Sequence, residues 1–169
     1  MQLRRDVDAL EERFDSCLGI HVRRWAYSHL LAEKAMLREL WGRGAPGREA
    51  FFLPLIVPIA RRLLPRAYKL TPDSIARSLN VVRDIVREVG ERLKDGRRYL
   101  VGDRFTAADL TFAALAAPAI FPARCHAVLP ELAEVPAAMR AEIEGLRESA
   151  AGQFAQRMYA SDRDVIAGN

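Results

Sequence analysis

The sequence predicts an all-α fold, a helical bundle that forms a single domain over residues 1–169 and ends in a polar tail at about residues 161–169. Apolar residues recur at helical spacings over long stretches, and no stretch alternates apolar and polar residues as a strand does. In addition, residues 110–123 contain no charge, and their only polar side chain is Thr111. A helix that is apolar all round should be buried on every face, so we expect this segment to form the centre of the bundle.

The first expected helix covers residues 3–41. Gly19 interrupts its apolar pattern and predicts a bend, and a cluster of glycines with Pro46 ends the helix. The apolar positions of this helix, at spacings of three, four or seven, are Leu3, Val7, Leu10, Phe14, Leu18, Val22, Trp25, Ala32, Met36 and Leu40.

Residues 50–60 form an unbroken apolar run that contains Pro54 and Pro58. Because an interior proline costs a helix about 3 kcal/mol, this segment should be kinked, or its helix should begin at Pro54. Two interpretations fit the run. Packing into the core is the preferred one, since long apolar runs are usually buried, and a wall of an apolar pocket is the alternative.

The following helices have clear start and stop signals. Residues 71–73 supply a threonine N-cap, a proline at the first helical position and an acid in the first turn, and residues 95–96 end that helix. Pro136 opens another helix, and a short last helix is expected from Gln153 to Tyr159. The apolar stripes are Ile75, Leu79, Val82, Val86, Val89 and Leu93 in the first of these helices and Met139, Ile143, Leu146 and Ala150 in the second.

The central helix has the strongest start signal of the chain. Thr106 suits the N-cap, and Asp109, at the third helical position, can reach back to the Thr106 amide in a reciprocal capping box. Phe105 and Leu110 occupy the two positions of a hydrophobic staple. Because this spacing is that of a cap, we assign Thr106 and Asp109 to folding rather than to acid–base catalysis. The prolines at positions 118 and 122 should close the helix.

The composition favours a globular protein of the cytoplasm. The net charge is +4, but acidic residues are interleaved with the arginines and lysine occurs only three times, so a solvated surface is expected and not a nucleic-acid partner. Two cysteines without a secretory signal indicate a reducing compartment and no disulfide framework. The apolar segments are too short to span a bilayer, and no membrane partner is expected.

Residues 95–118, DGRRYLVGDRFTAADLTFAALAAP, resemble the C-terminal helical domain of glutathione transferases, which carry such a capping box and staple after a Tyr-Leu-Val-Gly-Asp-like link. Residues 9–27, ALEERFDSCLGIHVRRWAY, also look like the long first helix of that domain. The resemblance implies the hydrophobic-substrate-binding half of a transferase. In this family a separate, N-terminal thioredoxin-like domain binds glutathione and supplies the residue that acts on its thiol.

No thioredoxin-like domain is recognised in this sequence, which begins next to the first helix. By the resemblance, the chain is a natural single-domain relative, half of a split system, or a fragment. We expect it not to conjugate glutathione alone, and to use glutathione as a cofactor only if a thioredoxin-like domain or chain is supplied. Expected partners are a second copy, as a homodimer, or that missing domain, together with an apolar small molecule. The alternative functions are a non-catalytic interaction or assembly module and a carrier of an apolar ligand or cofactor.

The resemblance also implies where substrate would bind, because the front half of the first helix borders the co-substrate site in this family. The substrate-binding candidates are Arg13, Phe14, Cys17, His21, Arg24 and Trp25. Cys17, His21, Trp25 and His29 follow at steps of four along the first helix. Cys17 with His21 could supply two metal ligands or an activated thiol, and the alternative is that Cys17 is a buried or half-buried small residue. The adjacent Cys125 and His126 form a second such pair. We expect neither a metal site nor a catalytic residue, since no third ligand or orienting group is recognisable.

Overall fold

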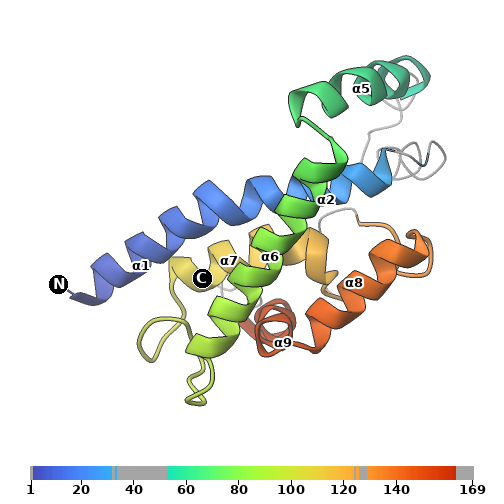
Figure 1. Ribbon diagram of the computed structural model, residues 1–169. Coiled ribbons are helices and arrows are strands. Elements are labelled where there is room, and N and C mark those ends of the chain that lie inside the picture. Colours follow the sequence, from blue (N-terminus) through green and yellow to red (C-terminus); the bar gives the residue numbers. More distant parts are fainter. Residues whose placement is uncertain (1, 32, 34–52, 124, 126–128, 163–169) are drawn as a thin grey trace.

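The computed structural model describes residues 2–31, 33, 53–123, 125 and 129–162, and within these ranges it contains helices and no strand (Figure 1). The predicted all-α fold is therefore confirmed. The elements are α1 (Gln2–Arg13), the π-helical η1 (Phe14–Leu18), α2 (Gly19–Leu30), α5 (Leu53–Ala67), α6 (Pro72–Arg92), α7 (Ala107–Ile120), α8 (Ala137–Glu148), α9 (Ala150–Arg157) and the π-helical η2 (Met158–Asp162).

The first long helix consists of α1, η1 and α2, which follow one another without a break. The irregularity expected near Gly19 takes the form of the π-helical segment directly before it, and Gly19 itself has helical backbone angles. A Cβ atom on Gly19 would lie 3.1 Å from Leu115 Cδ2 on α7. Gly19 thus lets α7 approach the first helix closely. The predicted continuation through residues 34–41 lies outside the described residues.

The central helix α7 packs against α1, η1 and α2 and also against α8, α9 and η2. Its Phe112 ring lies 5.3 Å from the ring of Phe14 and 6.1 Å from that of Phe154, measured between centroids. All three rings are fully buried. This aromatic stack therefore joins the first helix to α9 through the centre of the bundle.

The expectation that this segment is buried on every face is wrong for one side of α7. Ala107, Leu110 and Ala114 are exposed, and the Leu110 side chain retains 51% of its accessible surface. These positions, spaced by three and four residues, form one stripe that points away from the helices packed around α7. We call these three residues the α7 stripe.

The predicted end of α7 is also corrected. Pro118 lies inside the helix, which continues to Ile120. Phe121 then takes a left-handed conformation (φ 52°), and its amide donates to the Ala117 carbonyl at 2.8 Å. The helix therefore ends in a left-handed C-cap immediately before Pro122.

The capping box at the start of α7 is present and is extended by a contact that the sequence did not indicate. Asp109 Oδ2 accepts from both the backbone amide and the hydroxyl of Thr106, each at 2.7 Å. Oδ1 accepts from the amide of Leu100, also at 2.7 Å, and the whole Asp109 side chain is buried. Leu110, the expected staple position, is half exposed, whereas Phe105 lies edge-on to Tyr99 at 6.2 Å.

Helix α6 begins at its predicted cap, Thr71, which forms a capping box with Ser74. The Thr71 hydroxyl accepts from the Ser74 amide at 3.2 Å, and the Ser74 hydroxyl accepts from the Thr71 amide at 3.0 Å. The apolar stripe of α6 buries Val82, Val86 and Val89 in the core. After α6, a left-handed glycine at position 96 (φ 80°) turns the chain into the link that leads to α7.

Helix α5 contradicts the preferred interpretation of the apolar run. It begins at Leu53, one residue before Pro54, and it projects from the bundle (Figure 1). Val57 is buried against Leu31, in a cluster separate from the main core. The large apolar side chains on its other side are exposed: Leu55 (65%), Ile56 (46%), Ile59 (50%) and Leu63 (57%). No helix in the described part of the chain has the length and apolar character required to cross a membrane.

The last two helices meet at a sharp corner. Ala150 opens α9 rather than extending the stripe of α8, and the Ser149 hydroxyl caps α9 by accepting from the Gly152 amide at 3.0 Å. A Cβ atom on Gly152 would lie 2.1 Å from the Leu146 carbonyl oxygen and 2.8 Å from Arg147 Cα. Only glycine fits this corner, because the colliding atoms belong to the backbone.

Gly152→Ala should therefore destabilise the protein by about 1–3 kcal/mol, even though alanine is the better helix former, because the backbone must move to admit the methyl group. Gly145→Ala is the matched control. It lies on the exposed side of α8, where an added Cβ meets no atom within 4 Å, and it should stabilise the protein by about 0.5–1 kcal/mol. Urea unfolding measures the free energy of unfolding of both variants. If the two substitutions change this free energy equally and in the same direction, the corner does not require glycine at position 152.

Candidate functional site

The six substrate-binding candidates on the first helix separate into two groups. Phe14 and Trp25 are fully buried in the hydrophobic core, where Trp25 lies edge-on to His29 with ring centroids 5.5 Å apart. These two side chains present no surface to a ligand without a rearrangement of the core. The other four follow successive turns of the helix and are called the polar row: Arg13, Cys17, His21 and Arg24.

The polar row lies along α6 and is tied to it at both ends. Arg13 Nη2 is 3.5 Å from Glu88 Oε2, and both side chains are partly exposed. At the other end, His21 Nδ1 is 2.9 Å from Ser78 Oγ, and Arg24 Nη1 donates to the same oxygen at 3.1 Å. Arg24 Nε also donates to the carbonyl of Tyr68 at 2.8 Å. The row is therefore already engaged by protein groups along most of its length.

The hydrogen bonds around Ser78 determine the tautomer of His21. Ser78 is buried, and it donates its single hydroxyl proton to the Ser74 carbonyl at 2.7 Å. Its oxygen must then accept from both Arg24 and His21, so the neutral imidazole carries its proton on Nδ1. Burial, and secondarily the positive charge of Arg24, lower the pKa of His21 below its usual 6.5. The imidazole is therefore neutral at physiological pH and acts as a donor to Ser78.

Cys17 is half-buried between the two ends of the row. Its Sγ accepts from Arg13 Nη1 at 3.3 Å and lies 3.6 Å from Ser16 Oγ. Because the imidazole of His21 is bonded to Ser78 and not to this thiol, the geometry gives no support to the activated-thiol alternative. No group of three or more potential metal ligands occurs among the described residues. Cys125 is half-buried, and His126 lies outside the described residues.

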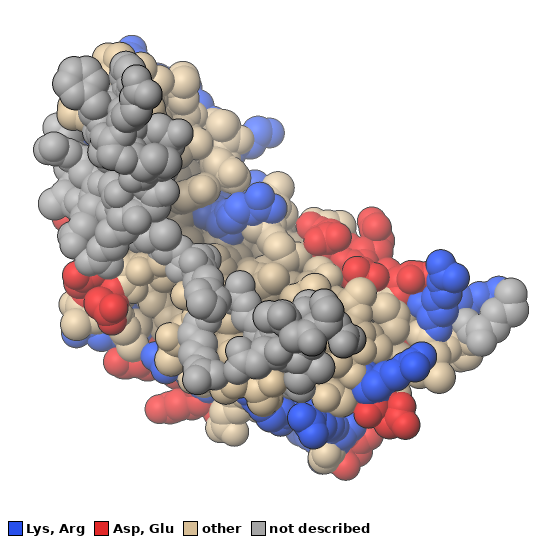
Figure 2. Space-filling view, turned by 180° about the vertical axis from the view of Figure 1, so that it is seen from behind, with Lys and Arg blue, Asp and Glu red and all other residues tan. Residues whose placement is uncertain are grey.

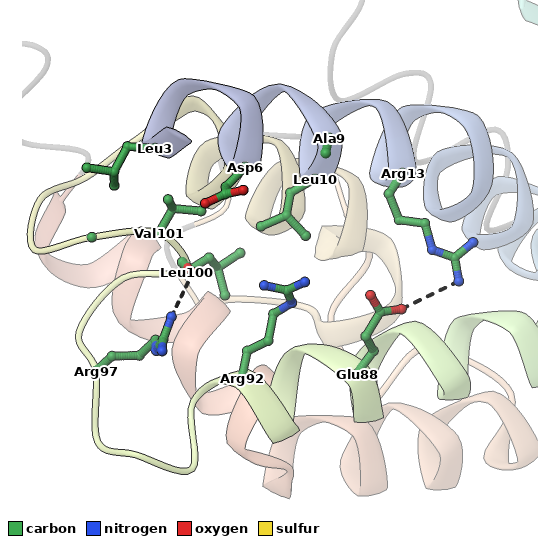
Figure 3. A pocket seen from close by; sticks show the side chains of 11 residues that line it. Leu3, Asp6, Ala9, Leu10, Arg13, Glu88, Arg92, Arg97, Leu100 and Val101 are labelled. Atoms are coloured by element: carbon green, nitrogen blue, oxygen red, sulfur yellow. Dashed lines mark hydrogen bonds and ion pairs between the residues drawn. The ribbon is translucent and has the colours of Figure 1, made fainter. Parts of the chain in front are cut away.

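An open groove begins at Arg13, between α1, the end of α6 and the link that precedes α7 (Figure 3). Its volume is about 390 Å³, within the range of small-molecule sites. In Figure 3, Arg92 extends from the end of α6 toward α1, and Arg97 donates to the Leu100 carbonyl at 3.3 Å. The groove is lined by Leu3, Asp6, Ala9, Leu10, Arg13, Glu88, Arg92, Arg97, Leu100, Val101 and Gly102.

A second hollow of about 730 Å³ adjoins the groove and shares Leu3, Val101 and Gly102 with it. Gly102 has a positive φ of 69°, and a Cβ there would lie 2.9 Å from Leu3 Cδ2. Glycine at this position therefore permits both the turn and the close approach of Leu3. Of the six substrate-binding candidates only Arg13 lines the groove. The other walls come from the end of α6 and from the link, whose sequence pattern indicated the family but not a ligand site.

Charges of both signs surround these features. On the face shown in Figure 2, basic and acidic side chains are interspersed over the body of the molecule and do not form a continuous basic stripe. Several charged side chains of the protein pair locally, for example Arg83 with Glu142 and Arg97 with Asp95. Hydrogen bonds from the side chain and the backbone amide of Arg97, together with the Arg97 charge, lower the pKa of Asp95 to about 2. Asp95 thus compensates the positive charge of Arg97, one of the three arginines that line the groove.

The environment of His21 predicts a pH-dependent contribution to stability. Because its pKa is lower in the folded state, the unfolded chain binds the proton first as the pH falls below 6.5, and stability is then lost. His21→Gln, which keeps a donor for Ser78 but does not titrate, should make the fall in stability between about pH 7 and about pH 5 shallower. Burial also lowers the pKa of His29. His29 therefore still contributes to the pH dependence of stability in His21→Gln, and the slope should become shallower without vanishing. Urea unfolding across this range measures the slope, and an unchanged slope would show that His21 titrates freely.

Comparison with known proteins agrees with this architecture. Residues 72–144 match the family model described as "Glutathione S-transferase, C-terminal domain", a stretch that contains α6, the link, α7 and most of α8. No curated protein and no solved structure matches the chain. The matched stretch includes one wall of the groove, from Glu88 to Gly102, whereas the polar row precedes it. The match confirms the resemblance inferred from residues 95–118, whereas residues 9–27 lie outside it. Residues 72–144 belong to the glutathione S-transferase C-terminal domain family.

Proposed function

We propose that this glutathione S-transferase-like protein binds an apolar small molecule in the groove between α1 and α6, as the substrate-binding half of a transferase. The observation that carries this proposal is the position of the groove. One of its walls, from Glu88 to Gly102, comes from the stretch that matches the family, and the other comes from the first helix. Arg13, a residue that the family resemblance indicated, lies where the two walls meet.

The chemistry of the groove favours a ligand with an apolar body and an anionic group. Leu3, Leu10, Leu100 and Val101 supply apolar surface, while the cationic side chains are those of Arg13, Arg92 and Arg97. Two of these arginines are already opposed by a carboxylate, Arg13 by Glu88 and Arg97 by Asp95. The remaining carboxylate of the lining, Asp6, accepts from Gln2 at 3.2 Å, and no ion pair joins it to Arg92. Arg92 makes no ion pair among the described residues. An anionic group in the groove would therefore pair best with Arg92.

Conjugation of glutathione is not part of this proposal for the chain alone. The reaction needs a group that stabilises the thiolate and backbone groups that hold the tripeptide. Within the described residues, the Cys17 thiol is hydrogen-bonded to the side chains of Arg13 and Ser16, and the His21 imidazole is hydrogen-bonded to the Ser78 hydroxyl. Neither is arranged to activate a second thiol. We infer that glutathione chemistry would require a thioredoxin-like domain or chain placed against this one.

A second candidate function is a non-catalytic interaction module that assembles with a partner domain or as a homodimer. The observation that favours it is the α7 stripe, where Leu110 is half exposed between two exposed alanines. Solvent-exposed apolar patches often mark contact surfaces. The two functions are compatible, because in a transferase the helical half both binds substrate and packs against the glutathione-binding domain.

The groove is tested with 8-anilinonaphthalene-1-sulfonate, an apolar anion whose fluorescence rises on binding. Arg92→Gln should weaken its binding by about 3–10-fold, the loss expected when one partly exposed charge-assisted hydrogen bond is removed. Arg77→Gln is the matched control, since Arg77 is an exposed arginine of the same helix outside the groove, and it should leave binding unchanged. If Arg92→Gln and Arg77→Gln bind the probe with equal affinity, the probe does not bind in the groove.

A conjugation assay with glutathione and a general aromatic halide complements this measurement. No turnover is expected from the purified chain, whether or not it binds the probe. Turnover that persists through purification and disappears in Cys17→Ser would overturn the non-catalytic part of the proposal and leave the groove assignment to be judged by the binding data.

A further inference from the structure

The outer face of α5, formed by Leu55, Ile56, Ile59 and Leu63, concentrates apolar surface on one short helix. Seven large apolar side chains are exposed in the described residues, and these are four of them. Exposed apolar residues that are scattered singly need no explanation, but four on successive turns of one helix form a patch of the kind that binds a partner or a membrane.

The opposite side of α5 is already occupied. Val57 is buried against Leu31, and Tyr27, Leu64 and Leu70 pack around this pair. The helix is therefore attached to the end of α2 by a small cluster of its own, which leaves the outer face directed away from the bundle. Figure 1 shows α5 projecting beyond the other helices.

Positive charge lies at the C-terminal end of the same face. Arg62 and Arg66 follow Ile59 by three and seven residues, which places them on the outer side, and both are exposed. The Arg66 guanidinium also donates to the Arg62 carbonyl at 2.9 Å. Lys69 is exposed just beyond the helix, and no aspartate or glutamate occurs in residues 53–72. The face is thus apolar at its N-terminal end and cationic at its C-terminal end.

We propose that α5 binds to the surface of anionic lipid bilayers. The outer face would enter the boundary between headgroups and acyl chains, while Arg62, Arg66 and Lys69 would contact lipid phosphates. At 15 residues α5 is shorter than the ~20 residues that a spanning helix requires, so it lies along the surface. This proposal revises the expectation of no membrane partner, which was based on apolar segments too short to span a bilayer and did not consider a helix lying along its surface.

The charge distribution favours a bilayer over a second copy of the chain. Two outer faces packed against each other would set the arginines against apolar side chains or against the arginines of the other copy, without any carboxylate from either helix to compensate them. An anionic lipid surface instead supplies apolar volume and negative charge in the same layer, which matches both ends of the face. The match depends on α5 alone and is independent of the groove between α1 and α6.

The test is co-sedimentation of the full chain with vesicles of phosphatidylcholine, alone or mixed with phosphatidylserine. The wild type should bind the mixed vesicles more tightly, and added salt should weaken this binding. Leu55→Gln/Ile59→Gln should reduce binding to mixed vesicles by about tenfold or more through lost apolar burial. Arg62→Gln/Arg66→Gln should reduce it several-fold and remove most of the preference for phosphatidylserine. Ile20→Gln, which changes an exposed isoleucine of α2 that lies outside the groove, is the matched control and should bind as the wild type does.

Because all substituted side chains are exposed, the variants should keep the helical circular dichroism and urea midpoint of the wild type. The proposal is overturned if the wild type does not bind the mixed vesicles, or if Leu55→Gln/Ile59→Gln binds them equally well. Light scattering supplies a third outcome. A wild-type dimer that Leu55→Gln/Ile59→Gln converts to a monomer, without vesicle binding by either, would assign the face to a second copy and reject the bilayer.

Discussion

The buried carboxylate of Asp109 is the interaction on which the centre of this structure depends. A buried charge is costly unless hydrogen bonds replace its hydration, and Asp109 accepts three at 2.7 Å. Two of them come from Thr106 and start α7. The third comes from the amide of Leu100, whose side chain is fully buried. One carboxylate thus fixes both the first turn of the central helix and the link that leads to it.

The groove follows from this arrangement. With Leu100 held in the core, Val101 and Gly102 are carried against Leu3 of α1, and the link becomes one wall of the groove. The same central helix positions the opposite wall, because Phe112 packs on Phe14 and Leu115 lies against Gly19. The site proposed for an apolar ligand is therefore a consequence of how α7 is anchored, and residues that never touch a ligand determine its shape.

The sequence predicted the local features of the fold well, because caps and turns are determined by residues close together in the chain. The cap at Thr71, the box at Thr106 and Asp109, and the helix after Pro136 lie where the spacing indicated. Periodicity also found the core positions of α6 and α8. Periodicity could not show which side of an apolar helix is covered by other elements. Leu110 and the outer face of α5 belong to apolar segments but are exposed.

The candidate site was predictable only in part, for the same reason. Arg13 and Arg24 were candidates by the family resemblance alone. The four-residue spacing of Cys17 and His21 indicated that these two side chains lie on one side of the first helix. It could not show that His21 and Arg24 are engaged by Ser78, 54 to 57 residues away, or that Phe14 and Trp25 are core residues. Arg92 and Arg97 carry no local signal at all. Arg92, at the end of α6, and Arg97, in the link, meet Arg13 only through contacts between segments far apart in the chain. The position of the link depends on Asp109, whose second oxygen accepts from the Leu100 amide, a contact that the capping-box spacing did not indicate.

The most direct test of this account is the urea-unfolding free energy of Asp109→Asn compared with that of Asp103→Asn. An asparagine at position 109 keeps the shape of the side chain but turns one acceptor into a donor, so at least one of the three donors loses its partner. The account predicts a loss of about 1–3 kcal/mol for Asp109→Asn. Asp103 is an exposed acid of the same link, and its variant should unfold as the wild type does. If Asp109→Asn and the wild type have the same urea midpoint and slope, the buried carboxylate does not hold the centre of the structure.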